Sequence, residues 1–182
     1  MEPRILLNKC LLIIREQPYR LCEIELYYYN DGHPDPYVHQ NEVQSIFGRL
    51  YFHKFRNGNW KGIDLTFGDK DTKYSFLIRT LQIPSGDFIT GACNVVNHLL
   101  KVWGYSSIPD FIEKEGEISI LQQNSVIYIV NVPELPDLPI FTGPRVGLSS
   151  KYPQYRTLPY RYVSMIGKKA IKKQRSALHQ LQ

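Results

Sequence analysis

The sequence contains no uninterrupted apolar run that approaches the roughly 18–20 residues needed for a membrane-spanning helix. Its apolar start, residues 5–14, is too short and is interrupted by Asn8 and Lys9. This start also lacks the basic leader and the small-residue cleavage site that are typical of a secretory signal. We therefore expect an intracellular protein, in the cytoplasm or in the nucleus or nucleoid, with no membrane partner.

Cysteine is scarce, with only Cys10, Cys22 and Cys93 in the whole chain. An odd and widely spaced set suits neither a disulfide scaffold nor a zinc cluster. Cys22 and Cys93 stand in apolar stretches, where a thiolate is disfavoured. We therefore predict that both pack in the core and do not act as nucleophiles.

Acidic residues are missing from the end of the chain. Residues 144–182 contain nine Lys and Arg and no Asp or Glu, whereas the first 143 residues contain 13 basic and 17 acidic side chains. Such an asymmetry indicates a surface that faces a polyanion. The terminal basic run, 168–175, is predicted to be a helix or a solvated tail, separate from the basic residues that precede it.

Apolar side chains are frequent enough for a packed core: 43% of the 182 residues are hydrophobic and 13% are aromatic, which excludes a disordered chain. Strand-forming residues predict strands over 19–29, 74–81, 122–132 and 158–163. The Asn57-Gly58 step predicts a hairpin that pairs 48–55 with 60–67. Apolar residues at helical spacing predict helices over 4–14 and 91–103. The sequence therefore predicts one α+β domain over 1–167, built on an antiparallel sheet, and a basic segment over 168–182.

The densest cluster of reactive side chains lies between Glu23 and His39. In the predicted strand, Glu23, Glu25 and Tyr27 share one face, opposite an apolar face. A carboxylate beside aromatic rings is suited to hydrolysis by activated water, because the base removes a proton while the rings hold an unsaturated substrate. The alternative is a solvated strand face with surface acids, and the residues alone leave both possibilities open.

Two further groups of polar residues stand out. His33 and His39, flanked by Asp31 and Asp35, offer imidazole and carboxylate ligands for a divalent metal, but without the helical spacing of strong metal motifs. Charges at Asp64 and Arg79 interrupt apolar strands, where an unpaired charge is costly to bury. These two residues and Thr66 could share the face of Glu25, with Arg79 orienting a carboxylate, or they could form a plain ion pair.

The order of these motifs resembles the alkyladenine (3-methyladenine) DNA glycosylase family. Residues 23–27 followed by His39 resemble its E-T-E-A-Y strand and the His that ends the next loop. Residues 48–53, 62–65 and 77–81 are similar to its G-x-L-Y-V-Y hairpin, its Asn-containing strand and its L-L-R-A-L strand. Further along, 90–100, 144–147 and 158–163 resemble its S-G-P-x-x-L helix, R-V-G segment and P-L-R-F-Y-V ending.

The resemblance implies a single domain with a curved antiparallel sheet and flanking helices, like these glycosylases or the C-terminal domain of formyltransferases. It implies a monomeric enzyme without cofactor or metal that binds double-stranded DNA, flips out a damaged purine and hydrolyses its N-glycosidic bond. Glu25 would be the general base and Arg79 would help hold the attacking water. The base would be bound by Tyr27, His39, His53 and Asp64. The hairpin tip, Phe55, Arg56 and Asn57, would fill the gap in the duplex, and phosphates would be contacted by Arg145, Lys151, Arg156 and Arg161.

Three residues or segments depart from the family pattern. The loop between Glu25 and His39 is longer and richer in proline, His53 replaces a stacking tyrosine, and Asp64 replaces an asparagine amide donor with an acceptor. These changes leave two alternatives to a DNA glycosylase. One is a module of the same fold that binds a nucleobase or nucleoside without turnover or acts on a small N-linked compound, and the other is a metal-dependent hydrolase that uses His33 and His39.

Overall fold

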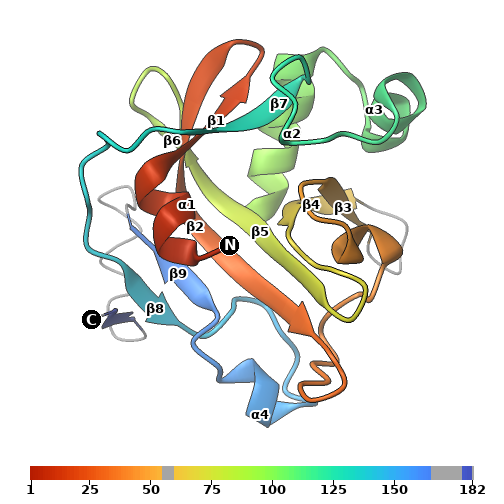
Figure 1. Ribbon diagram of the computed structural model, residues 1–182, viewed down its shortest axis with the longest axis vertical. Coiled ribbons are helices and arrows are strands. Elements are labelled where there is room, and N and C mark those ends of the chain that lie inside the picture. Colours follow the sequence, from red (N-terminus) through yellow and green to blue (C-terminus); the bar gives the residue numbers. More distant parts are fainter. Residues whose placement is uncertain (55–59, 165–177, 182) are drawn as a thin grey trace.

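In the part of the chain that the structure describes, ten antiparallel strands form one open sheet that is covered by a few helices (Figure 1). The computed structural model describes residues 1–54, 60–164 and 178–181. The strands are β1 (Cys10–Ile14), β2 (Gln17–Tyr29), β3 (Leu50–Lys54), β4 (Trp60–Thr66), β5 (Lys73–Gln82), β6 (Phe88–Thr90), β7 (Ile127–Asn131), β8 (Phe141–Gly143), β9 (Arg161–Val163) and β10 (His179–Gln180). The helices are α1 (Pro3–Lys9), η1 (Glu42–Ser45), α2 (Ala92–Trp103), α3 (Ile108–Glu115) and α4 (Pro153–Arg156). The predicted α+β domain with an antiparallel sheet is therefore confirmed.

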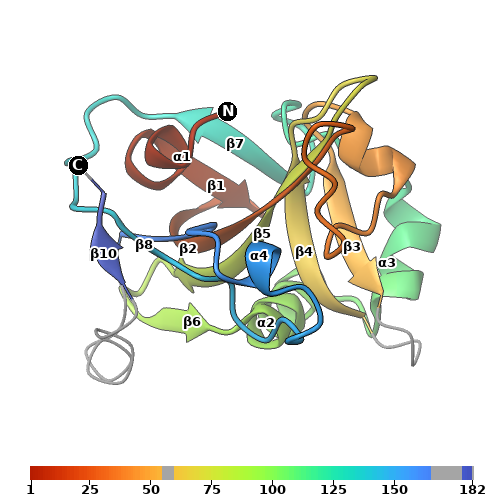
Figure 2. The ribbon, with the colours of Figure 1, turned by 90° about the horizontal axis from the view of Figure 1, so that it is seen from below.

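The two long strands β2 and β5 form the centre of this sheet. The main strand order is β10-β8-β9-β2-β5-β4-β3, while β1 pairs with both β2 and β7, and β6 pairs with β5. Figure 2 shows the sheet strongly curved, with α1 on one side of β2 and β5 and α2 on the other. Among the described residues, no helix is long and apolar enough to cross a membrane.

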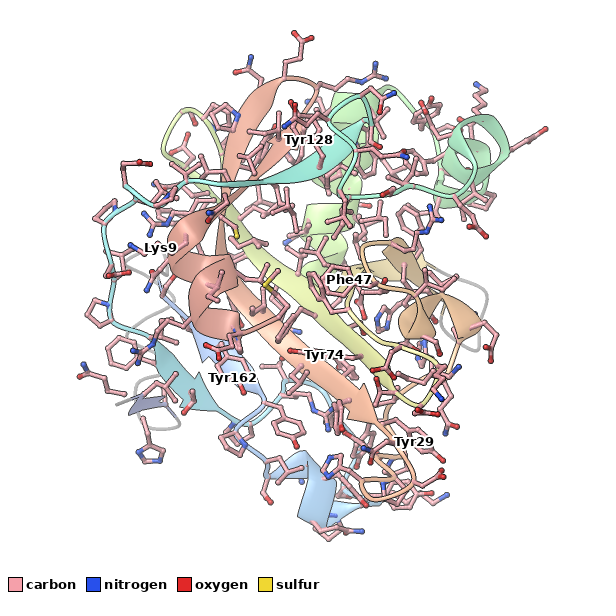
Figure 3. The ribbon with its side chains drawn as sticks, viewed as in Figure 1. Lys9, Tyr29, Phe47, Tyr74, Tyr128 and Tyr162 are labelled. Atoms are coloured by element: carbon pink, nitrogen blue, oxygen red, sulfur yellow. The ribbon has the colours of Figure 1, made fainter. Side chains whose placement is uncertain are left out.

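One buried apolar cluster, the main core, contains the apolar face of the central strands and includes residues of both α1 and α2. Ile24, Ile63, Leu65, Phe76 and Ile78 are buried on this face and belong to one cluster with Leu6 and Leu7 of α1. Tyr74 of β5 and Tyr162 of β9 pack against the same cluster on the side of α1 (Figure 3). The apolar stripe of α2 completes it with Val95, Val96, Leu99 and Trp103. The predicted helix over 91–103 is confirmed, and it ends at Gly104, which adopts the left-handed conformation that glycine favours.

A bulge in β2 places Leu21 on the opposite face of the sheet from the face that simple alternation predicts. The pairing of β2 with β5 shifts between Leu21 and Glu23 and again between Glu23 and Ile24. Simple alternation would place Leu21 with Glu23, but the extra residue Cys22 puts Leu21 into the main core beside Ile24. After the bulge, Glu23 and Glu25 remain on the face opposite the core.

Other element predictions are partly wrong. The stretch 4–14 is helical only as α1 and then becomes β1, because its second half pairs with β2 and β7. The strand predicted over 122–132 is shorter, helix α3 was not predicted, and residues 179–180 form the short strand β10 against β8. Of the predicted basic segment 168–182, only residues 178–181 are described by the structure.

The cysteines differ in exposure, which leads to a simple prediction. Cys10 and Cys22 are buried, and burial raises the pKa of Cys22 to about 12. Cys93 is exposed, contrary to the predicted core position, because it lies off the apolar stripe of α2.

We expect N-ethylmaleimide to modify Cys93 rapidly in the folded protein and Cys10 and Cys22 only after unfolding, because the reagent must reach a thiolate. Mass spectrometry of the native and denatured protein checks this; rapid native labelling of Cys22 would contradict it.

Candidate active site

Polar side chains from five neighbouring strands form a row on the face opposite the main core. The strand register places Arg161 of β9 across from Glu25 of β2, Glu25 across from Leu77 of β5, and Leu77 across from Asp64 of β4. Asp64 in turn faces Tyr51 of β3. Because paired residues on adjacent strands point to the same face, the predicted placement of Asp64 with Glu25 is confirmed.

Glu25 is fully buried and is held through both carboxylate oxygens. Its Oε1 accepts a hydrogen bond of 2.7 Å from the backbone N–H of Val146 and lies 3.3 Å from Nε of Arg79. Its Oε2 accepts a longer bond of 3.4 Å from the Tyr27 hydroxyl. Burial raises the pKa of the Glu25 carboxyl, and the Arg79 charge and the Val146 N–H oppose that shift. A raised pKa makes the ionised carboxylate a stronger proton acceptor, which is what a general base requires.

A second buried carboxylate, Glu23, shares the arginine. Arg79 Nε lies 3.2 Å from Glu23 Oε1, and Arg161 Nε lies 2.7 Å from the same oxygen. The hydroxyl of Thr80 donates to Glu23 Oε2 at 2.7 Å. The alternative of a solvated strand face is therefore wrong for Glu23 and Glu25. Arg79 bridges the two carboxylates. The two roles considered for it, an ion pair and the orientation of a carboxylate, are therefore both present at Glu25.

Two histidines are in ring contact at the other end of the row, with their planes tilted by 50°. The rings of His39 and His53 lie 4.7 Å apart between centroids, and His39 Nδ1 is 3.0 Å from the Tyr51 hydroxyl. Burial lowers the pKa of His39, with a smaller contribution of the same sign from His53, and Asp64 opposes both. His39 is therefore favoured as a neutral ring that can both stack and hydrogen-bond.

The carboxylate of Asp64 lies against the ring of His53. Its Oδ1 lies 2.6 Å from His53 Nε2, close enough for an ion pair, although the alignment does not meet the geometry of a hydrogen bond. Its Oδ2 accepts a hydrogen bond of 2.6 Å from Ser75, and Ser75 accepts one of 3.0 Å from the Gln44 amide. The carboxylate is thus fixed by a chain of three polar neighbours.

Tyr27 connects the two ends of the row. Its hydroxyl reaches Glu25, and its ring meets His53 edge-on at 5.7 Å between centroids. Leu77 and Val38 pack with Tyr27 in a small cluster, against which Ala92 at the start of α2 also packs. The structure therefore brings together all six of the predicted catalytic and base-binding residues, namely Glu25, Tyr27, His39, His53, Asp64 and Arg79.

Arg145 does not lie on an exposed edge. Its side chain and that of Asp35 are both 0% exposed, and their closest atoms are 2.6 Å apart. The guanidinium also lies over the ring of Tyr27, 4.7 Å from its centroid, and donates to the Leu26 carbonyl. Arg161 is buried on Glu23 in the same way. The expectation that these two arginines contact phosphates is corrected, because both are already bound to carboxylates inside the protein.

The remaining predicted DNA contacts differ in position. Lys151 and Arg156 are exposed, Arg156 in the last turn of α4, and their contact with phosphates stays a prediction. The hairpin-tip residues Phe55, Arg56 and Asn57 lie outside the described residues. The pairing of β3 with β4 on either side of them is as predicted.

The loop histidines do not form a metal site. His33 packs among Tyr28, Tyr155 and Tyr160, whereas His39 lies on His53 and Asp35 is bound to Arg145. Within 1–54, 60–164 and 178–181, no group of three or more His, Cys, Asp or Glu side chains is close enough to hold a metal ion. The metal hypothesis for His33 and His39 is wrong because the loop gives the two rings different neighbours.

Several residues of the site could not be expected from local sequence. Val146 contributes a backbone N–H, which no side-chain pattern reveals. Gln44 and Ser75 act through Asp64, and Ser75 could have been found only from its position in β5, where it faces Tyr27. The pairing of Glu23 with Arg161 joins residues 138 positions apart.

Fold and site together define an α+β protein whose antiparallel sheet carries a buried arginine–carboxylate network beside two histidines in ring contact. No protein-family model matches the chain. The chain is 37% identical over 195 residues to "Uncharacterized protein L759" of Acanthamoeba polyphaga mimivirus, and the alignment covers 97% of this chain and 89% of the viral protein. The chain belongs to the family of this mimivirus protein.

Proposed function

We propose that the protein is an N-glycosidic hydrolase of the alkyladenine DNA glycosylase type, acting as a monomer on double-stranded DNA with a damaged purine. The main observation in support is the buried Glu25, which is held by Arg79 and the Val146 N–H and lies next to Tyr27. The ring of Tyr27 in turn contacts His53, which is in ring contact with His39. The curved antiparallel sheet is compatible with the fold of that family or of the C-terminal domain of formyltransferases.

In this mechanism the damaged nucleotide leaves the duplex and its base enters between the aromatic side chains. Glu25 accepts a proton from a water molecule, whose oxygen attacks the sugar carbon as the bond to the base breaks. The sugar then passes through an oxocarbenium-like transition state. Arg79 limits the mobility of the carboxylate, and its charge favours the ionised form that can accept the proton. Tyr27 and His39 provide flat surfaces for the base.

The direct test is release of free base from alkylated duplex DNA and from free nucleosides. Release from duplex DNA by the wild-type protein, lost in Glu25→Gln, supports the proposal. Release from nucleosides alone would identify a nucleoside hydrolase, and no release from either would remove the proposed activity.

A second candidate, a module that binds a nucleobase or duplex without turnover, is favoured by one observation. Glu25 is 0% exposed, and both of its oxygens already have protein partners, so an attacking water must displace one of them. This candidate predicts tight binding of duplex DNA or nucleosides with no product for any lesion tested. Measurable turnover by the wild-type protein eliminates it.

If duplex DNA is the partner, affinity should depend strongly on salt. Each phosphate contact neutralised by a basic residue adds about 0.9 to the slope of log affinity against log salt. Replacing Lys151 and Arg156 together by alanine is therefore expected to lower this slope by roughly two. Fluorescence anisotropy with a labelled duplex at several salt concentrations measures it. Lys114→Ala, an exposed lysine on α3, serves as the matched control, and equal slopes for both variants would contradict the assignment.

A further inference from the structure

Glu23 is a buried carboxylate to which the proposed mechanism gives no role. The register of β2 against β5 shifts on both sides of this residue, and such bulges re-aim side chains and are frequent next to active sites. Burial of a charged pair is costly, and apolar residues of the same volume often serve stability equally well. The position of Glu23 beside Glu25 therefore needs a reason other than packing.

Two donors fix the Glu23 carboxylate between neighbouring strands. Arg161 Nε of β9 donates to Oε1 at 2.7 Å, and the Thr80 hydroxyl of β5 donates to Oε2 at 2.7 Å. Because β9 and β5 lie on opposite sides of β2, each oxygen is held from a different side. The carboxylate is thus kept in one orientation, with Oε1 directed at Arg79.

Glu23 takes a hydrogen bond that Glu25 would otherwise receive. Arg79 Nε carries a single hydrogen and lies 3.2 Å from Glu23 Oε1 and 3.3 Å from Glu25 Oε1. Among the described residues, this hydrogen is donated to Glu23, whereas Glu25 has only the ion-pair contact with the guanidinium. A hydrogen bond to a carboxylate favours its ionised form, so Glu25 keeps a higher affinity for a proton than it would have with Arg79 to itself.

The charge of Glu23 acts in the same direction. The groups that face Glu25 come from three strands and one loop: Arg79 of β5, Arg161 of β9, Glu23 and Tyr27 of β2, and the Val146 N–H after β8. Burial raises the pKa of the Glu25 carboxyl, Arg79 and the Val146 N–H oppose the rise, and the negative charge of Glu23 adds to it, with a weaker opposing effect of Arg161. Glu23 therefore works against the cations that surround Glu25.

We propose that Glu23 is a positioning residue that keeps Glu25 basic, because it draws the Arg79 hydrogen bond to itself and places a second negative charge beside Glu25. Arg161 and Thr80 in turn hold Glu23 in place. The inference rests on the proposed function only for the use of Glu25 as a base. Without Glu23, Glu25 would be ionised over a wider pH range but would accept a proton from water less readily.

The test is the titration midpoint of Glu25, measured by NMR of its side-chain carboxyl carbon and assigned by the signal that is missing from Glu25→Gln. In Glu23→Gln the like charge is gone and Arg79 can turn to Glu25, so the midpoint should move to lower pH. The acidic limb of base release should move with it. The plateau rate should fall by much less than the roughly 10²–10⁴-fold expected when the base itself is removed. An unchanged midpoint would overturn the assignment.

Two further variants separate charge from packing. Glu23→Asp keeps the charge on a shorter side chain, so its midpoint should stay closer to that of the wild type, and a midpoint equal to that of Glu23→Gln would overturn the proposal. Glu42→Gln removes a carboxylate that pairs with Lys73 at the surface, and it should leave the midpoint unchanged. An equal shift in this control would assign the effect to net charge and would also overturn the role of Glu23.

The outcome for Glu23 can be separated from that for the proposed function. If Glu23→Gln does not fold, its combination with Arg161→Gln removes both charges of the buried pair, and the midpoint should still fall because Arg79 is left to Glu25. The NMR midpoint does not depend on turnover. A shifted midpoint in a protein that releases no base would remove the proposed hydrolysis and support the role of Glu23 toward Glu25, whereas base release with an unshifted midpoint would do the reverse.

Discussion

Replacement of Glu25 by glutamine is expected to lower base release from alkylated duplex DNA by about 10²–10⁴-fold, the usual contribution of a general base. Glutamine keeps the size of the side chain, and its amide oxygen can still accept the hydrogen bond from Val146 N–H. The variant therefore removes the proton acceptor with little change in packing. Single-turnover release of the base measures the effect, and a rate comparable to that of the wild-type protein would refute the role of Glu25.

Stability measurements supply the control for this variant. Because burial raises the pKa of Glu25, the folded protein binds more protons than the unfolded chain between the ordinary value of 4.5 and the raised value. The wild-type protein should therefore lose stability relative to Glu25→Gln as pH rises above that ordinary value. Urea unfolding below and above pH 4.5 should show that the free energy of unfolding of Glu25→Gln increases relative to that of the wild type as pH rises. A variant that is folded and inactive at neutral pH assigns the loss of activity to the missing base.

The same raised pKa predicts how wild-type activity depends on pH. A general base must be ionised to accept a proton, so base release should increase as pH rises through the pKa of Glu25. This rising limb should be absent from the residual activity of Glu25→Gln. A pH profile of single-turnover rates for the two proteins checks it, and an identical acidic limb in both would assign the titration to another group.

The largest effect on stability is expected at the buried pair of Asp35 and Arg145. Asp35→Asn leaves the Arg145 guanidinium buried without its carboxylate, and breaking one partner of such a pair costs about 3–5 kcal/mol. The Asp35 oxygen that accepts from the Tyr37 N–H would also be altered. Urea unfolding of the variant and the wild type measures the difference. For a chain of this length the melting temperature should fall by roughly 6–20 °C.

A surface pair provides the comparison. Asp110 and Lys114 form an i,i+4 ion pair near the surface on α3, and Asp110→Asn should lower the free energy of unfolding much less than Asp35→Asn does, because solvent screens this pair. A double variant that makes both Asp35 and Arg145 apolar, such as Asp35→Leu with Arg145→Met, should recover much of the loss, because no unpaired charge remains buried. A loss below about 1 kcal/mol in Asp35→Asn would show that the buried charge is compensated elsewhere.

The elements that could be predicted from the sequence are those with strong local signals. Alternating apolar residues identified β2 and β5, the Asn-Gly step identified the hairpin of β3 and β4, and the apolar stripe identified α2. Elements determined by distant partners were missed or misread. Residues 10–14 form a strand because β2 and β7 lie on both sides of them, although their apolar pattern also suits a helix.

Strand alternation predicted which residues of the central strand share the face of the site. It did not predict which charged side chains are buried in ion pairs. Alternation placed Glu23, Glu25 and Tyr27 on one face. The charges that interrupt apolar strands suggested Asp64 and Arg79 on the same face, and the resemblance added base-binding roles for His39 and His53. Burial of Arg145 and Arg161 could not be foreseen, because their carboxylate partners lie 110 and 138 residues earlier in the chain. A net positive region in a sequence can therefore contain internal ion pairs that contribute nothing to the surface potential.

The pairing of Glu23 with Arg161 also has a consequence for synthesis on the ribosome. At about 5–20 residues per second, the 138 positions between them correspond to roughly 7–28 s during which β2 exists without β9. Through that interval the edge of β2 next to the acidic pair has no neighbouring strand, and such an open edge can pair with another chain. Until Arg79 of β5 has been synthesised, 56 residues after Glu23, the two acidic side chains on β2 have no cationic partner. We expect this charge to oppose pairing of the nascent strand with another chain, because charged side chains disfavour association at an open edge.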